Sequence, residues 1–277
     1  MKELAVPESR EASAGIPVVT EADLVDGLER LGVVPGDVLL VHASLSSFGF
    51  VSGGEQAVIA ALRRAVGVFG TVAMPSQSWQ LCDPDFLDDP ALDAGARARV
   101  RASLPPYDPV RTPSRSMGAI AELFRTEPGA VRSPHPHRSF AAAGVEASGL
   151  MRRHDPDDPF GETSPLARLY DADARIVLLG VGFDRCTSLH LAEGRSAGAS
   201  GRARVRNGAP VVDAGERRWA TWDEPVVEDD DFAAIGGAFE ASGAVRSTRI
   251  GSAACRAMSM RALVDFAGTR MTRPFNC

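Results

Sequence analysis

Residues 37–74 carry the pattern that most constrains what this chain can fold into. The run Asp37–Val41 is short and almost wholly apolar, and it lies between turn residues and small polar residues, as strands buried on both faces do. After Gly53-Gly54, apolar residues recur at helical spacing over 58–65, and a second apolar run follows at Thr71–Met74. A helix that connects two strands within about forty residues allows the strands to lie parallel, so this pattern predicts an α/β domain.

The other periodic segments extend this unit. Residues 76–113 are rich in proline and aspartate and are predicted to form a long surface excursion, while 1–19 lack periodicity and are predicted to be a frayed tail. The predicted elements are a helix at 21–31 behind a capping box at Thr20–Asp23, a helix at 117–124, a strand at 175–182, a helix at 187–193, a hairpin at 211–222, a helix ending at 239 and a helix at 252–266. We therefore expect a central mixed, largely parallel sheet flanked by helices, with a small C-terminal hairpin and helix addition.

Charge and composition exclude several classes of function. The formal charge is −6 and all the cationic residues except Lys2 are arginine, so a basic face for nucleic acid is not expected. No apolar run reaches the roughly 18 residues of a membrane span, and the acidic N-terminus does not resemble a secretory signal. The four cysteines show no CxxC spacing, which argues against a disulfide framework. These features predict a cytoplasmic protein.

His190 is the strongest candidate for catalysis. It follows the strand-like run at 175–182, and a helix at 187–193 would put His190 and Glu193 on one face at spacing i,i+3. A carboxylate beside an imidazole raises its basicity and can fix its tautomer, as a general base requires. The same spacing occurs on solvated helices, so the pattern alone leaves both interpretations open.

Three further histidines have a structural and a functional interpretation each. His42 ends the first buried strand, at the carboxyl edge where α/β sheets present ligands, but it also suits a polar strand terminus. His135 and His137 flank a proline; such a pair can ligate zinc if further ligands join it, although a rigid turn is the simpler interpretation. A zinc hydrolase that uses His135, His137, His190 and Glu193 is therefore an alternative.

Glycines and acidic residues mark candidate binding segments. Gly53-Gly54 opens a predicted helix, and Gly118 lies in the first turn of the next helix beside Arg115, so both expose backbone N–H groups that suit phosphate. Residues 223–231 gather Asp223, Glu224 and further acids. Such a run is usually a solvated face, but within a cleft it would select polycations.

Several collinear stretches resemble the aminoglycoside 3-N-acetyltransferase family, also called the antibiotic N-acetyltransferases. The resemblance extends over about residues 20 to 270, and its C-terminal pieces, 235–240 and 262–267, fit less sharply. The matching stretches are VHASLSSFG (41–49) with Gly53-Gly54, TVAMP (71–75), TPSRSMG (112–118) running into Ile120-Ala121-Glu122, SPHPHRSFAAAG (133–144), GETSPLAR (161–168) and LLGVGFDRCTSLHLAE (178–193).

The resemblance implies acetyl transfer from acetyl-coenzyme A to the 3-amino group of a 2-deoxystreptamine antibiotic, which confers resistance. It also implies one α/β acetyltransferase domain over 20–277, a fold distinct from the GNAT acetyltransferases, and no metal. The partners would be coenzyme A and a polycationic aminoglycoside, with neither nucleic acid nor membrane, in a monomer or homodimer. The family's roles fall on His190 as catalytic histidine with Glu193 as its acid, on His42, Ala43, Ser44, Leu45, Ser114, Arg115, Met117 and Gly118 for coenzyme A, and on Glu193, Asp223 and Glu224 for the antibiotic.

The chain departs from the family pattern close to His190. Many relatives have His where this chain has Phe183 and Asn where it has Cys186, and residues 84–104 lack the tryptophans common in that region. These positions bear on the choice of antibiotic. A family member that acetylates another amine in a biosynthetic pathway and a catalytically silent coenzyme A-binding protein are therefore alternatives.

Overall fold

A seven-stranded sheet forms the centre of the molecule. The computed structural model describes residues 16–196 and 202–271. The strands run in the order β10-β11-β7-β2-β4-β6-β5. Their bounds are β2 Val38–Ala43, β4 Thr71–Pro75, β5 Val131–Arg132, β6 Phe140–Gly144, β7 Arg175–Leu179, β10 Arg246–Ile250 and β11 Ala253–Ser259. β2 pairs in parallel with β4 and with β7, whereas the outer neighbours pair antiparallel. The predicted mixed sheet is confirmed, with its parallel part at the centre.

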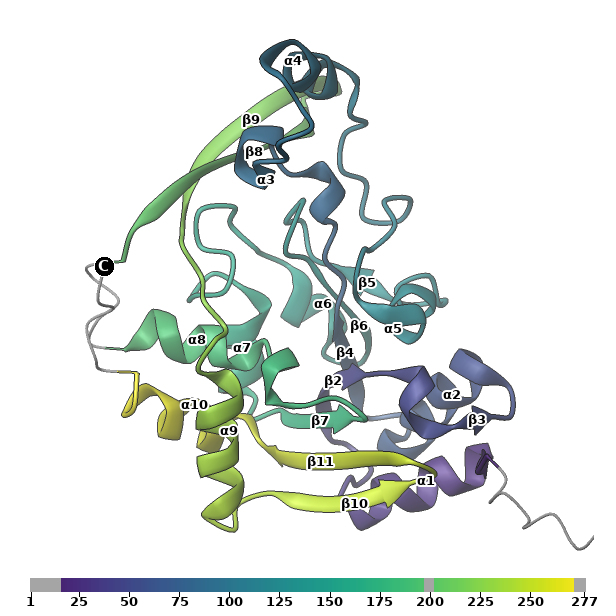
Figure 1. Cartoon of the computed structure of the whole chain (residues 1–277). Helices are drawn as coiled ribbons and strands as arrows, with labels where there is room; N and C mark the ends of the chain where they lie inside the picture. Colours follow the sequence, from purple (N-terminus) through teal and green to yellow (C-terminus); the bar gives the residue numbers. More distant parts are fainter. Residues whose placement is uncertain (1–15, 197–201, 272–277) are drawn as a thin grey trace, which may run out of the picture.

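Helices cover both faces of this sheet (Figure 1). One face carries α1 (Glu21–Arg30), α2 (Gly54–Val66) and α5 (Gly118–Phe124), and the other carries α6 (Ala147–Met151), α7 (Pro165–Asp171), α8 (Ser188–Arg195), α9 (Phe232–Ala241) and α10 (Met260–Gly268). Along β2, Leu39 and Val41 belong to the first hydrophobic core and Leu40 to the second. Burial on both faces explains the continuous apolar run. None of the helices in the described part of the chain combines the length and apolar character that crossing a bilayer requires.

Three segments differ from the sequence-based expectation. The end of the predicted tail forms β1 (Val18–Val19), which pairs in parallel with β3 (Phe50–Val51); residues 1–15 lie outside the described residues. The excursion contains α3 (Pro84–Leu87) and α4 (Ala94–Ser103), and α4 buries no residue, so it leaves no apolar period in the sequence. The first half of the predicted helix at 252–266 is wrong because Ala253–Ser259 forms strand β11, where small residues weaken the alternating pattern.

The predicted hairpin is confirmed and is longer than expected. It consists of β8 (Arg204–Asp213) and β9 (Glu216–Pro225), joined by Ala214 and Gly215, both at positive φ, as a tight hairpin turn requires. The hairpin lies beside α3 and α4, at the top of Figure 1 and away from β10 and β11. Hydrogen bonds join the hairpin to the 76–113 excursion: Tyr107 N donates to Pro210 O (3.0 Å), and Asp83 N donates to Asn207 Oδ1 (3.2 Å).

A group of buried aromatic side chains lies where this hairpin meets the body. His135, His137 and His154 are at most 3% exposed, and the ring centroids of His135 and His154 are 4.7 Å apart. Trp222 of β9 packs on His137 at 5.1 Å. Burial lowers the pKa of His137 and that of His154 to about 3, and it lowers the pKa of His135 well below its usual value. The histidines in this group are therefore neutral in the folded state.

We predict that the protein loses stability as the pH falls below about 6.5. An unfolded histidine binds a proton there, whereas His137 and His154 in the folded chain do not until about pH 3. Each such histidine lowers the free energy of unfolding by up to about 1.4 kcal/mol for each pH unit. Urea unfolding between about pH 7.5 and 5.5, above the range where carboxylates titrate, measures this slope.

The matched variant is His154→Gln, which removes one of these histidines. Its stability profile should be less steep by about one proton, whatever its absolute stability. A wild-type free energy of unfolding that stays constant across this pH range would contradict the prediction.

Candidate active site

A cavity of about 1080 Å³ opens where the parallel strands β2, β4 and β7 end. Its walls include the residues that follow each of those strands: 43–46 after β2, Gln77 and Trp79 after β4, and 184–187 after β7. Because the carboxyl ends of parallel strands meet at one edge of a sheet, loops distant in sequence converge there. The cavity is the candidate active site.

His190 lines this cavity and is backed by a buried carboxylate. Its Nδ1 lies 2.6 Å from Oε2 of Glu193, a side chain that is only 3% exposed, and Nη2 of Arg202 lies 2.8 Å from the other carboxylate oxygen. Because a carboxylate only accepts hydrogen bonds, this contact puts the imidazole proton on Nδ1 and leaves Nε2 as a base. The i,i+3 spacing predicted from sequence is thus realised on α8.

Two aromatic rings fix the plane of the His190 imidazole. Phe160 stacks on it with ring centroids 4.6 Å apart and an interplanar angle of 18°, and the Phe232 centroid lies at 4.7 Å. The side chain of His190 is 12% exposed. An imidazole held between two rings and a buried carboxylate loses little further freedom when it acts on a bound molecule.

His42 also lines the cavity, and its ring is more deeply buried than that of His190. It is buried in β2, and burial lowers the pKa of His42 to about 4, so the ring is neutral near pH 7. Its Nε2 lies 3.4 Å from Oγ1 of Thr187, the residue before α8. His42, Ala43, Ser44 and Leu45 all line the cavity, as the resemblance implied.

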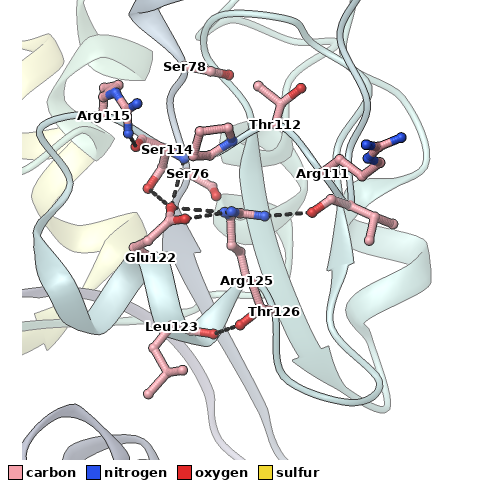
Figure 2. A network of polar contacts seen from close by, with 12 residues as sticks. Ser76, Ser78, Arg111, Thr112, Ser114, Arg115, Glu122, Leu123, Arg125 and Thr126 are labelled. Carbon is pink, nitrogen blue, oxygen red and sulfur yellow. Dashed lines mark hydrogen bonds and ion pairs between the residues drawn. The ribbon is translucent and has the colours of Figure 1, made fainter.

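The 112–118 stretch divides into a lining part and a supporting part. Met117 and Gly118 line the cavity, and a Cβ built on Gly118 would lie 3.6 Å from the carbonyl oxygen of Ala43 across it. Ser114 and Arg115 do not line it. Ser114 is buried and donates to Glu122, and the Arg115 side chain turns back to the Ser114 carbonyl (Figure 2).

The structure does not bring Asp223 or Glu224 to the cavity wall. Asp223 is half exposed and accepts a hydrogen bond from Arg206 Nε at 2.7 Å. Glu224 is fully buried, with Oε1 at 2.9 Å from Nη2 of Arg138 and Oε2 accepting from the Trp222 indole at 2.9 Å. The hairpin side chains alternate between its faces, so the two neighbours have opposite surroundings.

Several lining residues were not predicted as site residues. Asp184 and Asp229 are carboxylates on the wall, and Arg138 is a buried cation whose guanidinium lies 3.8 Å from the centroid of the Trp79 ring. Arg185, beside Asp184, is a second lining cation. Asp184 belongs to the matched stretch 178–193 and Asp229 to the acidic run, but nothing in either pattern marks one carboxylate over its neighbours.

The alternative chemistries find little support in the geometry. No group of three or more His, Cys, Asp or Glu side chains within residues 16–196 and 202–271 is arranged to hold a metal ion, so the four residues of the zinc alternative are not assembled into one site. Cys186 lines the cavity, but burial raises the pKa of its thiol to about 12, which opposes a thiolate. Phe183 is buried against Gly236 of α9 and packs in the second core.

An imidazole with a buried carboxylate behind it lies on the wall of a cavity large enough for a cofactor-sized molecule, an arrangement typical of general acid–base sites in α/β proteins. Comparison with known proteins specifies the class further. The chain belongs to the aminoglycoside 3-N-acetyltransferase family, whose sequence model matches residues 40–272. It is therefore an acyltransferase-family protein with a fold that is not that of the GNAT enzymes.

Two curated relatives cover most of the chain. The SPbeta prophage-derived aminoglycoside N(3')-acetyltransferase-like protein YokD of Bacillus subtilis (strain 168) is 39% identical over 249 residues, which is 90% of each chain. Aminoglycoside N(3)-acetyltransferase VIII of Streptomyces fradiae is 45% identical over 208 residues, which is 74% of this chain and 71% of the relative.

Solved structures show the same fold. Aminoglycoside acetyltransferase AAC(3)-Xa superposes with a TM-score of 0.86 at 36% identity and covers 94% of each chain. AAC-IIIb, solved as a binary complex with CoASH, gives 0.82 at 31% identity and covers 94% of this chain and all of its own. AAC-VIa, solved bound to sisomicin, gives 0.81 at 30% identity, over 91% of this chain and 97% of that one.

We predict that the two neighbouring acids of β9 contribute very differently to stability. Glu224→Gln removes the charge that neutralises buried Arg138 and should lower the free energy of unfolding by about 3 kcal/mol or more. Asp223→Asn, the matched control on the exposed face, should change it by less than about 0.5 kcal/mol. Urea unfolding of both variants measures this, and equal effects would contradict it.

Proposed function

We propose that the protein transfers the acetyl group of acetyl-coenzyme A to the 3-amino group of the 2-deoxystreptamine ring of aminoglycosides, with His190 as general base, and thereby confers resistance. The observation that carries the proposal is the contact of His190 with buried Glu193 on the wall of the cavity at the strand ends. The family membership and the relatives' names supply the reaction class.

The donor thioester is proposed to lie between the segment after β2 and the loop before α5. His42, Ala43, Ser44 and Leu45 form one side and Ser116, Met117 and Gly118 the other, and both sides line the cavity. A relative of the same fold is solved with CoASH, which supports the assignment of this cavity to coenzyme A.

The reaction needs a free amine. An alkyl ammonium has a pKa near 10.4, whereas an imidazole has one near 6.5, so attack starts from the neutral amine or from an amine whose pKa the site depresses. As nitrogen bonds to the acetyl carbon, Nε2 of His190 takes the amine proton. The C–S bond then breaks, and the imidazolium of His190 gives this proton to the sulfur of coenzyme A, which leaves as a thiol and restores the base. Glu193 stabilises the imidazolium, and Arg202 holds Glu193 in place.

The other ammonium groups of the acceptor need carboxylates on the wall. Asp184 and Asp229 line the cavity, whereas Asp223 and Glu224 are engaged with Arg206 and Arg138 away from it. Glu193 does not line the cavity itself, but its carboxylate contacts His190, which does. We therefore assign the acceptor-anchoring role to Asp184 and Asp229, because several charge-assisted contacts in parallel fix which amine faces the thioester.

A second candidate is acetylation of an amine that carries fewer positive charges. Among the lining charges, Asp184 is paired with Arg185 (3.1 Å) and Arg138 with Glu224 (2.9 Å), so the wall is not strongly acidic. Thiol release from acetyl-coenzyme A, measured across a panel of aminoglycosides, analogues without the 3-amino group and simple amines, separates the two. Turnover only with less charged amines favours the second candidate.

We predict that His190→Asn lowers kcat by about 10²- to 10⁴-fold, because general-base catalysis supplies a factor of that size. The measurement is thiol release at saturating acetyl-coenzyme A. The variant should keep the wild-type circular dichroism spectrum and coenzyme A affinity, which separates lost chemistry from lost structure. Near-wild-type turnover would remove His190 from the mechanism.

We predict that Asp229→Asn raises KM for the aminoglycoside several-fold and changes kcat by less than about twofold, because it removes a binding charge and not the base. Asp230→Asn is the matched control, since Asp230 is the exposed neighbour and does not line the cavity. Equal KM values for the two variants would place the acceptor elsewhere.

A further inference from the structure

Glu122 of α5 is the centre of a polar network beneath the loop that lines one side of the cavity (Figure 2). Its Oε2 accepts hydrogen bonds from the backbone N–H of Ser114 (2.7 Å), the Ser114 hydroxyl (2.6 Å) and Nε of Arg125 (2.9 Å). Its Oε1 accepts from Nη2 of Arg125 at 2.5 Å. One carboxylate thus joins the helix to the segment four residues before it.

Arg125 extends the network to the other end of the same loop. Its Nη1 donates to the carbonyl of Val110 at 2.7 Å, so residues 110 and 114 are both fixed to α5. The Arg125 side chain is 5% exposed. Arg132 of β5 binds the carbonyl of Thr112 between them and donates to Ser139 Oγ at 2.9 Å. Hydrogen bonds from Arg125 and Arg132 and to the Glu122 carboxylate therefore hold the loop in place.

The part of the loop that faces the cavity has a conformation that needs such support. Ser116 has a φ of 62°, in the left-handed region that a residue with a side chain rarely adopts, and Gly118 has a φ of 84°. Both residues line the cavity. A strained residue of this kind persists only when its surroundings hold it. Upstream, Arg115 N donates to Gln77 O at 2.8 Å, and beyond that the nearest support is the Glu122 network.

We propose that Glu122, acting through Ser114 and Arg125, is a positioning residue that holds the 110–118 loop in the conformation that binds the acetyl-coenzyme A donor. The inference rests on the proposed function, since it assigns the donor to that wall. Glu122 itself is not among the residues that line the cavity. It acts by keeping Ser116, Met117 and Gly118 in place.

The Glu122 carboxylate stays ionised near neutral pH. Desolvation opposes ionisation, but hydrogen bonds from Arg125 and Ser114 outweigh it and lower the pKa of Glu122 to about 2. Its contribution to donor binding is therefore constant near neutral pH.

The size of the effect follows from the populations of the loop. If only a fraction of molecules holds the binding conformation, the apparent Kd for the donor rises by the inverse of that fraction. Removing a carboxylate that accepts four hydrogen bonds should reduce that population about tenfold, so the apparent Kd should rise about tenfold.

The test is calorimetric titration of the full chain with coenzyme A, followed by steady-state kinetics. The variants are Glu122→Ala, Glu122→Gln, which keeps an acceptor oxygen but not the charge, and Ser114→Ala as a milder change. The control is Glu240→Gln, which breaks a similar part-buried bidentate pair, Glu240 with Arg256 at 2.9 Å, between α9 and β11. We expect Kd for coenzyme A to rise about tenfold in Glu122→Ala and less in Glu122→Gln and Ser114→Ala, with wild-type affinity in the control.

In turnover, the Glu122 variants should raise KM for acetyl-coenzyme A and leave kcat and the acceptor KM within about twofold, a division that general loss of stability does not produce. Coenzyme A affinity equal to that of Glu240→Gln, or a loss of kcat instead of affinity, overturns the inference. A wild-type protein that fails to bind coenzyme A overturns the proposed function itself, and a wild-type that binds it while the Glu122 variants bind equally well overturns only the positioning role.

Discussion

Strand β2 is buried on both faces and pairs in parallel with β4 on one side and with β7 on the other. Because these three strands point the same way, the chain leaves all of them at one edge of the sheet. Residues 42–45 at the end of β2 and residues 184–187 after β7 therefore both line the cavity at that edge. The antiparallel strand β6 begins at this same edge, and Arg138, which precedes it, also lines the cavity. The helix that carries His190 begins just after β7, which is why the base lies over the cavity.

Ion pairs give the acidic protein its local order. Glu193 is held by Arg202, Glu224 by Arg138 and Glu122 by Arg125, and in each pair the arginine side chain is at most 8% exposed. A guanidinium binds a carboxylate through two parallel hydrogen bonds and so fixes orientation as well as charge. The near-absence of lysine suits this use, whatever its origin in coding. These three pairs hold in place His190, the β8–β9 hairpin and the 110–118 loop, respectively.

The sequence was sufficient where burial follows a strict period. The strand–helix–strand unit and α8 with its His190–Glu193 pair were predictable, because apolar runs and i,i+3 spacing depend on local geometry, whereas the 42–45 segment was assigned from the resemblance to the family. The sequence was not sufficient where the role of a residue depends on polar contacts with residues distant in the chain. Ser114 and Glu224 are polar residues whose roles depend on Glu122 and Arg138, distant partners that no local pattern reveals. β11 was missed because alanines give too weak an alternation to outweigh helical propensity.

The excursion and the β8–β9 hairpin lie outside both hydrophobic cores; the contact of Asn207 with Asp83 joins them to each other, and that of Arg138 with Glu224 joins the hairpin to the body. The donor segments, in contrast, are continuous with strands and helices that those cores require. Exposed side chains of the hairpin, such as Asp223, can therefore be exchanged with little loss of folding free energy, whereas changes at Glu224 and around β2 and α5 are costly. In evolutionary terms, the exposed surface of the hairpin can drift while the segments around β2 and α5, to which we assign the acyl donor, stay fixed, so an inhibitor that occupies that part of the cavity would meet few escape routes.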